Sequence, residues 1–260
     1  MPLSRIVSSH DIPQFIFCGN TILTGAKENA LLPDAEVSAR CIEFQVAEDW
    51  FTDTDHRYTA LMLENGTPPI PPDTRWIPLR QFFAEQPEAL ASLAARAHGL
   101  LAWRHTYRYC PSCGAPLRDD ADETARVCIK CERTQFPVLE PAVIVIVRKA
   151  GRILLARHRQ RNTNIYTCLA GYVEHGETLE QCVYREVKEE TGIEVTNITY
   201  RMSQSWPFPD QLMVGFSAEW QRGELCVQPN EIQEAAWFDP DRLPDIPAPG
   251  SLAYRLITGR

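Results

Sequence analysis

GYVEHGETLEQCVYREVKEETGI, residues 171–193, decides the fold of this 260-residue chain, because it gathers six acidic side chains around a strand end, a loop and a helix. Glycines at positions 171 and 176 bracket a loop that must turn tightly before the helix begins. Thr178 is a suitable N-cap residue, and Gly192 should end the helix in a left-handed conformation. The stretch therefore predicts a helix from near Thr178 to Gly192.

The glutamates of this helix are predicted to face the protein interior. Residues three and four apart share a helix face, so Glu186 and Glu190 stack, with Glu189 beside them. Val183 and Leu179 lie within roughly 40° of the same direction, on the stripe that should be buried. This placement argues against the usual alternative, a solvated acidic face. Because converging, partly buried carboxylates repel one another, a divalent cation that prefers oxygen ligands, Mg²⁺ or Mn²⁺, should compensate them.

The spacing of the stretch resembles the Nudix box at every fixed position. Those positions are Gly171, Glu177, Arg185, Glu186, Glu189, Glu190 and Gly192. Proteins with this box hydrolyse a nucleoside diphosphate linked to another moiety, and they use divalent metals to activate water and to neutralise the pyrophosphate. The resemblance also implies that the carbonyl of Ala170, just before the box, is a metal ligand.

Roles for the box residues follow partly from chemistry and partly from the resemblance. Glu177 and Arg185 are available to pair across the loop and helix, and such a pair would hold the loop rather than take part in chemistry. The resemblance implies Glu186 and Glu190 as metal ligands, with Glu189 as a further ligand or a base. Which glutamate accepts the proton of the attacking water stays open.

Four of the nine cysteines form two CxxC pairs fourteen residues apart. They are Cys110, Cys113, Cys128 and Cys131. Each pair presents two thiolates from one turn, so together they complete the tetrahedron of a structural zinc ribbon with no open position for water. A redox dithiol or a pair of disulfides is the alternative. The other five have no ligand spacing and are expected to be small buried hydrophobes, namely Cys18, Cys41, Cys168, Cys182 and Cys226.

Composition indicates an ordinary globular protein with room for two domains, since 44% of its residues are hydrophobic and 23% charged. The start of the chain lacks the pattern of a secretory signal, and no apolar run is long enough to span a membrane, so we expect a cytoplasmic protein. The formal net charge of -8 disfavours bulk nucleic-acid binding and would repel a phosphate substrate, so substrate capture must be local.

We predict three parts: an N-terminal domain at 1–104, a zinc ribbon at 105–137 and a catalytic domain at 138–260. The first part should contain strands at 15–18, 41–46 and 60–63, a turn-rich segment at 66–73 and a helix at 87–103. The last should contain strands at 142–148, 152–157, 166–170, 198–203, 212–221 and 235–239, and a helix at 250–258. The order of these elements predicts an α/β (α+β) class with a Nudix α/β/α sandwich and a mixed sheet, preceded by the ribbon and a mixed α/β domain.

Beyond the box lies SQSWPFPDQLM, residues 203–213. Its prolines fix φ around Trp206 and Phe208, so these aromatic rings should be held rigidly where they can stack on bases. A hydrophobic plug under a loop is the alternative. Together with the zinc knuckles, the segment resembles the signature SQPWPFPxS of the NADH pyrophosphatase family of Nudix hydrolases, from about Tyr107 to the end of the chain.

The resemblance implies cleavage of NADH or NAD to nicotinamide mononucleotide and AMP, removal of NAD caps from RNA 5′ ends, and a homodimer. It implies Glu231 as a further metal ligand. The substrate contacts that it implies are Glu123, Phe136, Tyr172, Gln204, Ser205, Trp206, Pro207, Phe208, Pro209, Asp210, Gln211 and Ala253. Ser205 replaces the first proline of the signature, Gln211 stands where the family has serine, and Phe136 stands where a relative has tyrosine. These departures concern fine specificity more than reaction type.

Two other functions remain open from the sequence. One is a Nudix enzyme for another substrate, such as ADP-ribose or a diadenosine polyphosphate. The other is a zinc-ribbon nucleic-acid-binding regulator with an inactive Nudix fold. The complete box and the acidic charge argue against the regulator, because a degenerate site should have lost one or more glutamates.

Overall fold

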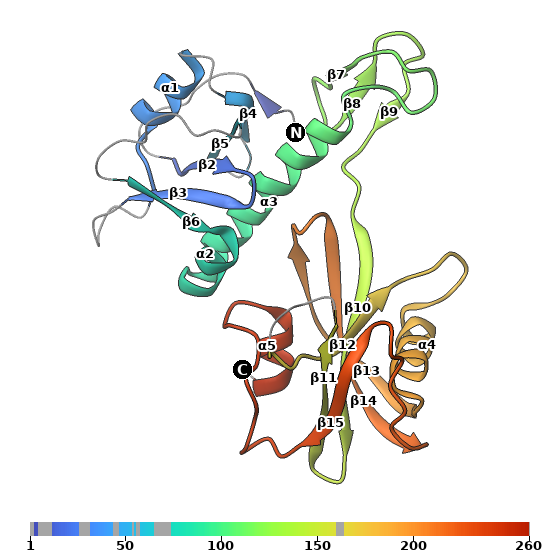
Figure 1. Cartoon of the computed structure of the whole chain (residues 1–260). Helices are drawn as coiled ribbons and strands as arrows, with labels where there is room; N and C mark the ends of the chain where they lie inside the picture. Colours follow the sequence, from blue (N-terminus) through green and yellow to red (C-terminus); the bar gives the residue numbers. More distant parts are fainter. Residues whose placement is uncertain are drawn as a thin grey trace. The chain divides into compact units, whose positions relative to one another are not determined.

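The computed structural model describes residues 3–4, 12–25, 32–43, 47–53, 55, 58–64, 74–159 and 164–259 of the chain (Figure 1). The chain forms two compact units, Met1–Val138 and Leu139–Arg260, which are described separately below. No helix within the described ranges is both long and apolar enough to cross a membrane.

The first unit contains a sheet whose described strands follow the order β1-β4-β5-β2-β3-β6. Its strands are β1 (Leu3–Ser4), β2 (Gln14–Cys18), β3 (Thr21–Gly25), β4 (Ala47–Asp53), β5 (Tyr58–Leu63) and β6 (Thr74–Pro78), and its helices are α1 (Ala35–Glu43), α2 (Leu79–Glu85) and α3 (Glu88–Thr106). Phe15 and Phe17 alternate with residues of the other face along β2, so both rings enter one buried aromatic group with Phe51 and Tyr58.

Most elements predicted in this unit are confirmed, and one is wrong. Strands 15–18 and 60–63 lie within β2 and β5, and helix 87–103 is α3. The segment predicted as strand 41–46 instead begins with the end of α1, because Val37 and Cys41 lie four residues apart and pack with Ile42 against the apolar sheet face. Residues 44–46 and the turn-rich segment 66–73 lie outside the described residues.

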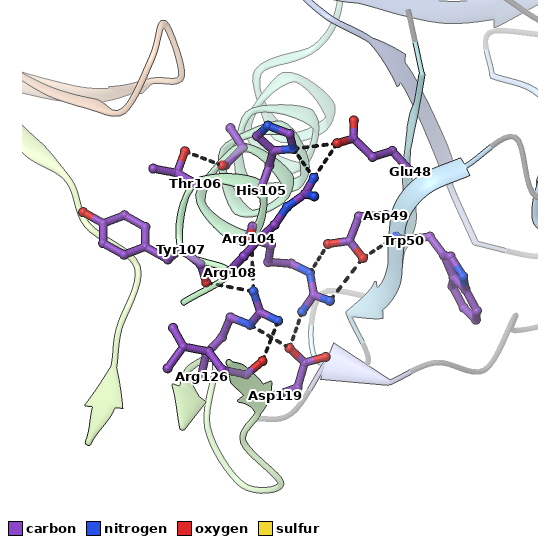
Figure 2. Close-up of polar contacts among 12 residues, drawn as sticks. Glu48, Asp49, Trp50, Arg104, His105, Thr106, Tyr107, Arg108, Asp119 and Arg126 are labelled. Atoms are coloured by element: carbon purple, nitrogen blue, oxygen red, sulfur yellow. Dashed lines mark hydrogen bonds and ion pairs between the residues drawn. The ribbon is translucent and has the colours of Figure 1, made fainter. Parts of the chain in front are cut away.

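The cysteine segment is a small antiparallel sheet that is tied to α3 and β4 by buried charges (Figure 2). Its strands are β7 (Leu117–Asp119), β8 (Arg126–Cys128) and β9 (Thr134–Gln135). The Arg104 side chain, only 1% exposed, donates from Nε to Asp49 and from Nη1 to Asp119, both at 2.6 Å. Arg126 donates to the carbonyls of Arg104 and Tyr107. These contacts fix the cysteine segment to the end of α3.

The second unit is the predicted sandwich, with α4 (Leu179–Thr191) and α5 (Leu252–Thr258) on opposite faces of one mixed sheet (Figure 1). The strand order is β13-β14-β10-β11-β15, and β12 pairs with β10. The strands are β10 (Glu140–Lys149), β11 (Arg152–His158), β12 (Leu169–Tyr172), β13 (Glu194–Trp206), β14 (Gln211–Arg222) and β15 (Ile232–Phe238). β10 and β14 are parallel, whereas the other pairs are antiparallel.

Alternation along the central strand divides the core into two layers. Val143, Val145 and Val147 pack with α4, whereas Ile144 and Ile146 pack with α5. All six strands and the final helix that we predict in this unit are present. The strand predicted at 166–170 begins three residues later, at Leu169, and ends at Tyr172 as β12, because its pairing with β10 begins only at Leu169.

Candidate active site

Thr178 caps the start of α4 and Gly192 ends the helix, as predicted. The Thr178 hydroxyl accepts from the backbone N–H of Gln181 at 3.2 Å, while the Gln181 side chain accepts from the N–H of Thr178 at 2.7 Å. At the other end Gly192 has φ 73°, the left-handed conformation that glycine adopts without strain. The helix is therefore held in one register, which determines the direction of its glutamates.

Two of the three box glutamates on α4 face inward and the third faces outward. Glu190 is 2% exposed and lies on the same side as the buried Val183 and Val187. The Glu186 side chain is 13% exposed, whereas that of Glu189 is 54% exposed. The predicted inward stripe thus contains Glu186 and Glu190, and Glu189 lies at its edge.

The carboxylate of Glu186 occupies the space that a side chain at position 171 would fill. A Cβ on Gly171 would lie 1.9 Å from Cδ of Glu186. Leu169 packs with α4, so Gly171, two residues later in β12, presents the same face. The absence of a side chain at Gly171 therefore lets the box carboxylate sit directly on the strand.

Arg185 connects the loop, the helix and β12. Its guanidinium makes the predicted pair with Glu177, at 2.6 and 3.0 Å, and this hydrogen bonding lowers the pKa of Glu177 to about 2. It also contacts Glu186 at 2.8 Å and Glu189 at 3.2 Å, and donates to the Tyr172 carbonyl at 3.0 Å. Arg185 thereby orients one inward carboxylate as well as holding the loop.

Glu186 is paired with Arg185, whereas Glu190 has no cationic partner among the residues that the structure describes. Burial, followed by the charges of Glu186, Glu231 and Glu189, raises the pKa of Glu190 to about 8. Oε2 of Glu190 is buried and has no hydrogen-bond partner in the part of the chain that the structure describes. Carboxylate oxygens with this combination of burial and like charge fit a divalent cation, which would supply the missing partner.

The other two predicted ligands come from separate elements. Ala170 lies in β12 opposite Ile144 of the central strand. Glu231 precedes β15, in a turn that hydrogen-bonds to the end of α4 through Gln228, whose N–H donates to the Glu190 carbonyl at 3.0 Å. Burial is the main cause of the raised pKa of Glu186 and of Glu190, and charge repulsion from Glu231 adds to it in both.

A second group of predicted residues lies on the α5 face of the sheet. Met202, Met213 and Ala170 pack against the α5 layer, so Gln204, Gln211 and Tyr172, each two residues away on the same strands, present that face too. The residues predicted to contact substrate there are Tyr172, Gln204, Gln211 and Ala253. Gln204 donates to the Gly250 carbonyl at 2.7 Å, which links β13 to the start of α5.

The predicted aromatic segment is the turn of the β13–β14 hairpin. Trp206 ends β13 opposite Gln211, and its ring meets that of Phe208 edge-on, with centroids 5.1 Å apart. Ser205 pairs with Leu212 next to it in the ladder. The remaining residues of the turn are Pro207, Pro209 and Asp210. The Asp210 carbonyl accepts from the N–H of Glu140 at 2.8 Å, which joins the turn to the start of β10.

Glu123 and Phe136, the other predicted substrate contacts, belong to the unit Met1–Val138. Glu123 is exposed, and its N–H donates to Asp120 at 2.9 Å. Phe136 is 55% exposed, which leaves its aromatic face accessible within this unit.

The four predicted zinc ligands converge. All four sulfur atoms lie within 4.8 Å of one another, and the separations from Cys113 to Cys128 and Cys131 are 3.4 and 3.5 Å. A tetrahedron with Zn–S bonds of ~2.3 Å requires sulfurs about 3.8 Å apart, whereas a disulfide requires about 2.05 Å. Backbone N–H groups of Ser112 and Lys130 point at Cys110 and Cys128, each at 3.4 Å. The geometry fits zinc and excludes a disulfide.

Known families match almost the whole chain. Residues 15–103 match the NADH pyrophosphatase-like rudimentary NUDIX domain, residues 105–136 the NADH pyrophosphatase zinc ribbon domain, and residues 138–256 the NUDIX domain. A protein named NAD-capped RNA hydrolase NudC from Chromobacterium violaceum is 46% identical over 182 residues, covering 70% of this chain and 69% of that protein. The chain belongs to the NADH pyrophosphatase family of Nudix hydrolases.

A second relative agrees with this membership. A NAD-capped RNA hydrolase NudC from Stutzerimonas stutzeri is 43% identical over 196 residues, covering 75% of this chain and 71% of that protein. A crystal structure of a NUDIX hydrolase from Nitrosomonas europaea has a TM-score of 0.48 and 25% identity, and covers 58% of this chain and 86% of that one. In this NADH pyrophosphatase family member, the four cysteines form a structural zinc site.

Two features of this Nudix hydrolase are not evident from its sequence alone. The N-terminal part matches a rudimentary NUDIX domain, but it carries no box motif that would have indicated this. The sequence also does not predict the Arg185–Glu186 contact, although it indicates the pairing of Arg185 with Glu177. Adjacent residues on a helix do not normally face each other, and only the bend of the long arginine side chain toward Glu177 brings the two groups together.

Proposed function

We propose that this chain hydrolyses the pyrophosphate bond of NADH and NAD, giving nicotinamide mononucleotide and AMP, and removes NAD caps from RNA 5′ ends. The observation that carries the proposal is the buried Glu190, which has a raised pKa and an Oε2 without a hydrogen-bond partner among the described residues. Glu186 and Glu231 add like charge to it. This carboxylate is suited to bind a divalent cation, which in turn would bind the pyrophosphate. The names of the relatives support the choice of dinucleotide.

The chain's own residues account for binding and orientation. Glu186, Glu190 and Glu231, with the Ala170 carbonyl, would hold Mg²⁺ or Mn²⁺. When bound, such a cation neutralises the pyrophosphate and activates water. Arg185 keeps the Glu186 carboxylate turned toward the site through their 2.8 Å contact.

Glu189 is the most accessible box carboxylate, and we propose it as a further ligand or as the base that takes the proton of the water. The oxygen of that water joins one phosphorus atom, and the bridging oxygen leaves with the other phosphate. Tyr172 and the rings of Trp206 and Phe208 would face the aromatic ends of the dinucleotide.

Three broader assignments belong to the same proposal. The chain acts in the cytoplasm, as expected from its sequence, and as a homodimer, as the family resemblance implies. Sedimentation analysis of the zinc-loaded protein would test the dimer. Its organisation is an N-terminal domain at 1–104, a zinc ribbon at 105–137 and a catalytic domain at 138–260. Glu123 and Phe136 would contribute substrate contacts from the ribbon.

The experiment is a kinetic comparison of NADH, NAD, ADP-ribose and a short NAD-capped RNA, each with Mg²⁺ and with Mn²⁺. We expect AMP and the nicotinamide mononucleotide from the dinucleotides, a monophosphorylated RNA from the capped substrate, and no products without a divalent cation. Preferred hydrolysis of ADP-ribose would show a different Nudix specificity, and inertness toward all four would contradict the proposal.

A further inference from the structure

The Tyr172 side chain is joined by a hydrogen bond to Gln211, one of the two residues that depart from the family signature. Nε2 of Gln211 donates to the Tyr172 hydroxyl at 2.5 Å, although the two residues are 39 positions apart. The family has serine at the position of Gln211, and a serine side chain is two atoms shorter than glutamine. The hydrogen bond is therefore a feature of this chain and not of the family signature.

The register of the sheet explains how these side chains meet. Ala142 of β10 lies opposite Tyr172 on one side and opposite Met213 on the other, and Gln211 is two residues before Met213 on the same face. Ala142 is buried and carries only a methyl group, so it leaves room for Tyr172 and Gln211 to reach across β10. The hydrogen bond between Gln211 and Tyr172 therefore crosses β10 over Ala142, the smallest side chain of that strand.

Tyr172 also links both halves of the site. Its carbonyl accepts from Arg185, which contacts Glu186, so its backbone is tied to the inward carboxylates. Its hydroxyl is tied to Gln211, which pairs with Trp206 and so closes the aromatic hairpin. The side chain remains 46% exposed, with a ring surface available for a ligand.

We propose that Gln211 is a positioning residue that holds the Tyr172 ring ready to stack on an aromatic ring of the dinucleotide. The inference rests on the proposed function, because it assigns the way in which that site receives its substrate. Gln211 acts through the tyrosine hydroxyl, and the bond fixes the ring before substrate arrives. A ring that is already fixed loses less conformational entropy when the substrate binds. The effect should therefore be on KM rather than on kcat.

The first test is a double-mutant cycle on NADH hydrolysis. Loss of one hydrogen bond should raise KM about threefold to tenfold in Q211A and in Y172F, with kcat within about twofold of wild type. The double variant should match either single variant, because both remove the same bond. Q221A changes the same residue type at an exposed position near the other end of β14 and should leave KM unchanged. Multiplied effects in the double variant would overturn the inference and show that Gln211 contacts the substrate itself.

The second test needs no substrate. In protein labelled with 3-fluorotyrosine, Y172F identifies the fluorine resonance of Tyr172 among those of the eight tyrosines. That resonance should shift in Q211A and stay in place in Q221A, and an unchanged resonance in Q211A would overturn the contact. Wild-type protein that leaves NADH intact would overturn the proposed function and the positioning role with it, whether or not the fluorine spectra show the bond.

Discussion

Because Gly171 has no side chain, the carboxylate of Glu186 can occupy the space that a Cβ would fill. In G171A the new Cβ would meet the end of a flexible glutamate side chain, at 1.9 Å from Cδ, so the carboxylate rather than the backbone should move. We expect NADH hydrolysis to fall by about 10- to 100-fold, the scale of losing a group that orients a metal ligand. Steady-state kinetics and a thermal melt would measure activity and stability together.

Gly151 provides the matched control. It lies in the turn between β10 and β11 with φ 81°, and a Cβ there would have open space around it. G151A should therefore lose about 1 kcal/mol of stability through left-handed strain and keep its activity. The opposite outcome, an active G171A or an inactive G151A, would contradict the role assigned to Gly171.

The Glu177–Arg185 pair predicts a pH-dependent contribution to stability. Hydrogen bonding from Arg185 lowers the pKa of Glu177 from 4.5 to about 2, so the pair stabilises the fold above pH 4.5 and this contribution is lost as the pH falls toward 2. At pH 7, E177Q should lower the free energy of unfolding by about 1–2 kcal/mol. Urea titrations from pH 7 to pH 3 should show the difference shrinking; a constant difference would mean that the ion pair is not its source.

At the scale of elements, the start of α4 should be sensitive to its cap. T178A removes the hydroxyl that accepts from Gln181 and should cost about 1 kcal/mol. T178S keeps the hydroxyl and should restore most of that stability. Denaturant unfolding of the three proteins measures this, and equal losses in T178A and T178S would show that the methyl group, not the cap, is responsible.

The elements around the box were predictable because local signals agree there. Thr178, Gln181 and Gly192 mark both ends of α4, and the apolar runs of β10 and β14 have the length of buried strands. Residues 41–43 are helical rather than extended because their apolar side chains suit either period, and packing against the sheet favours the helix.

The parts of the site that could not be predicted depend on long-range register. Glu186 over Gly171 and Gln211 against Tyr172 are set by which residues of separate strands lie opposite each other. The same holds for Arg104, whose partner Asp49 is 55 residues away. Spacing in the sequence identifies the participants, but it does not specify these contacts.

At the scale of the whole molecule, the zinc site should stabilise the first unit without taking part in hydrolysis. The purified protein should contain one zinc per chain, because four thiolates fill a tetrahedron. C128S should lose this zinc and lower the melting temperature. Cys226 is exposed and lies outside the cluster, so the expectation that it is buried is wrong, and C226S should keep both the zinc and the melting temperature. Metal analysis with thermal melts measures this, and full zinc content in C128S would contradict the assignment.

The central claim is that inward carboxylates on α4 hold the cation that binds a dinucleotide's pyrophosphate, and E190Q tests it most directly. Glutamine keeps the shape of the buried side chain but removes its charge, whereas E180Q makes the same change at an exposed position of the same helix. The decisive measurement is AMP release from NADH with Mg²⁺ or Mn²⁺ by folded wild type, E180Q and E190Q. We predict near wild-type turnover for E180Q and a loss of at least about 100-fold for E190Q; near wild-type turnover by E190Q would contradict the account.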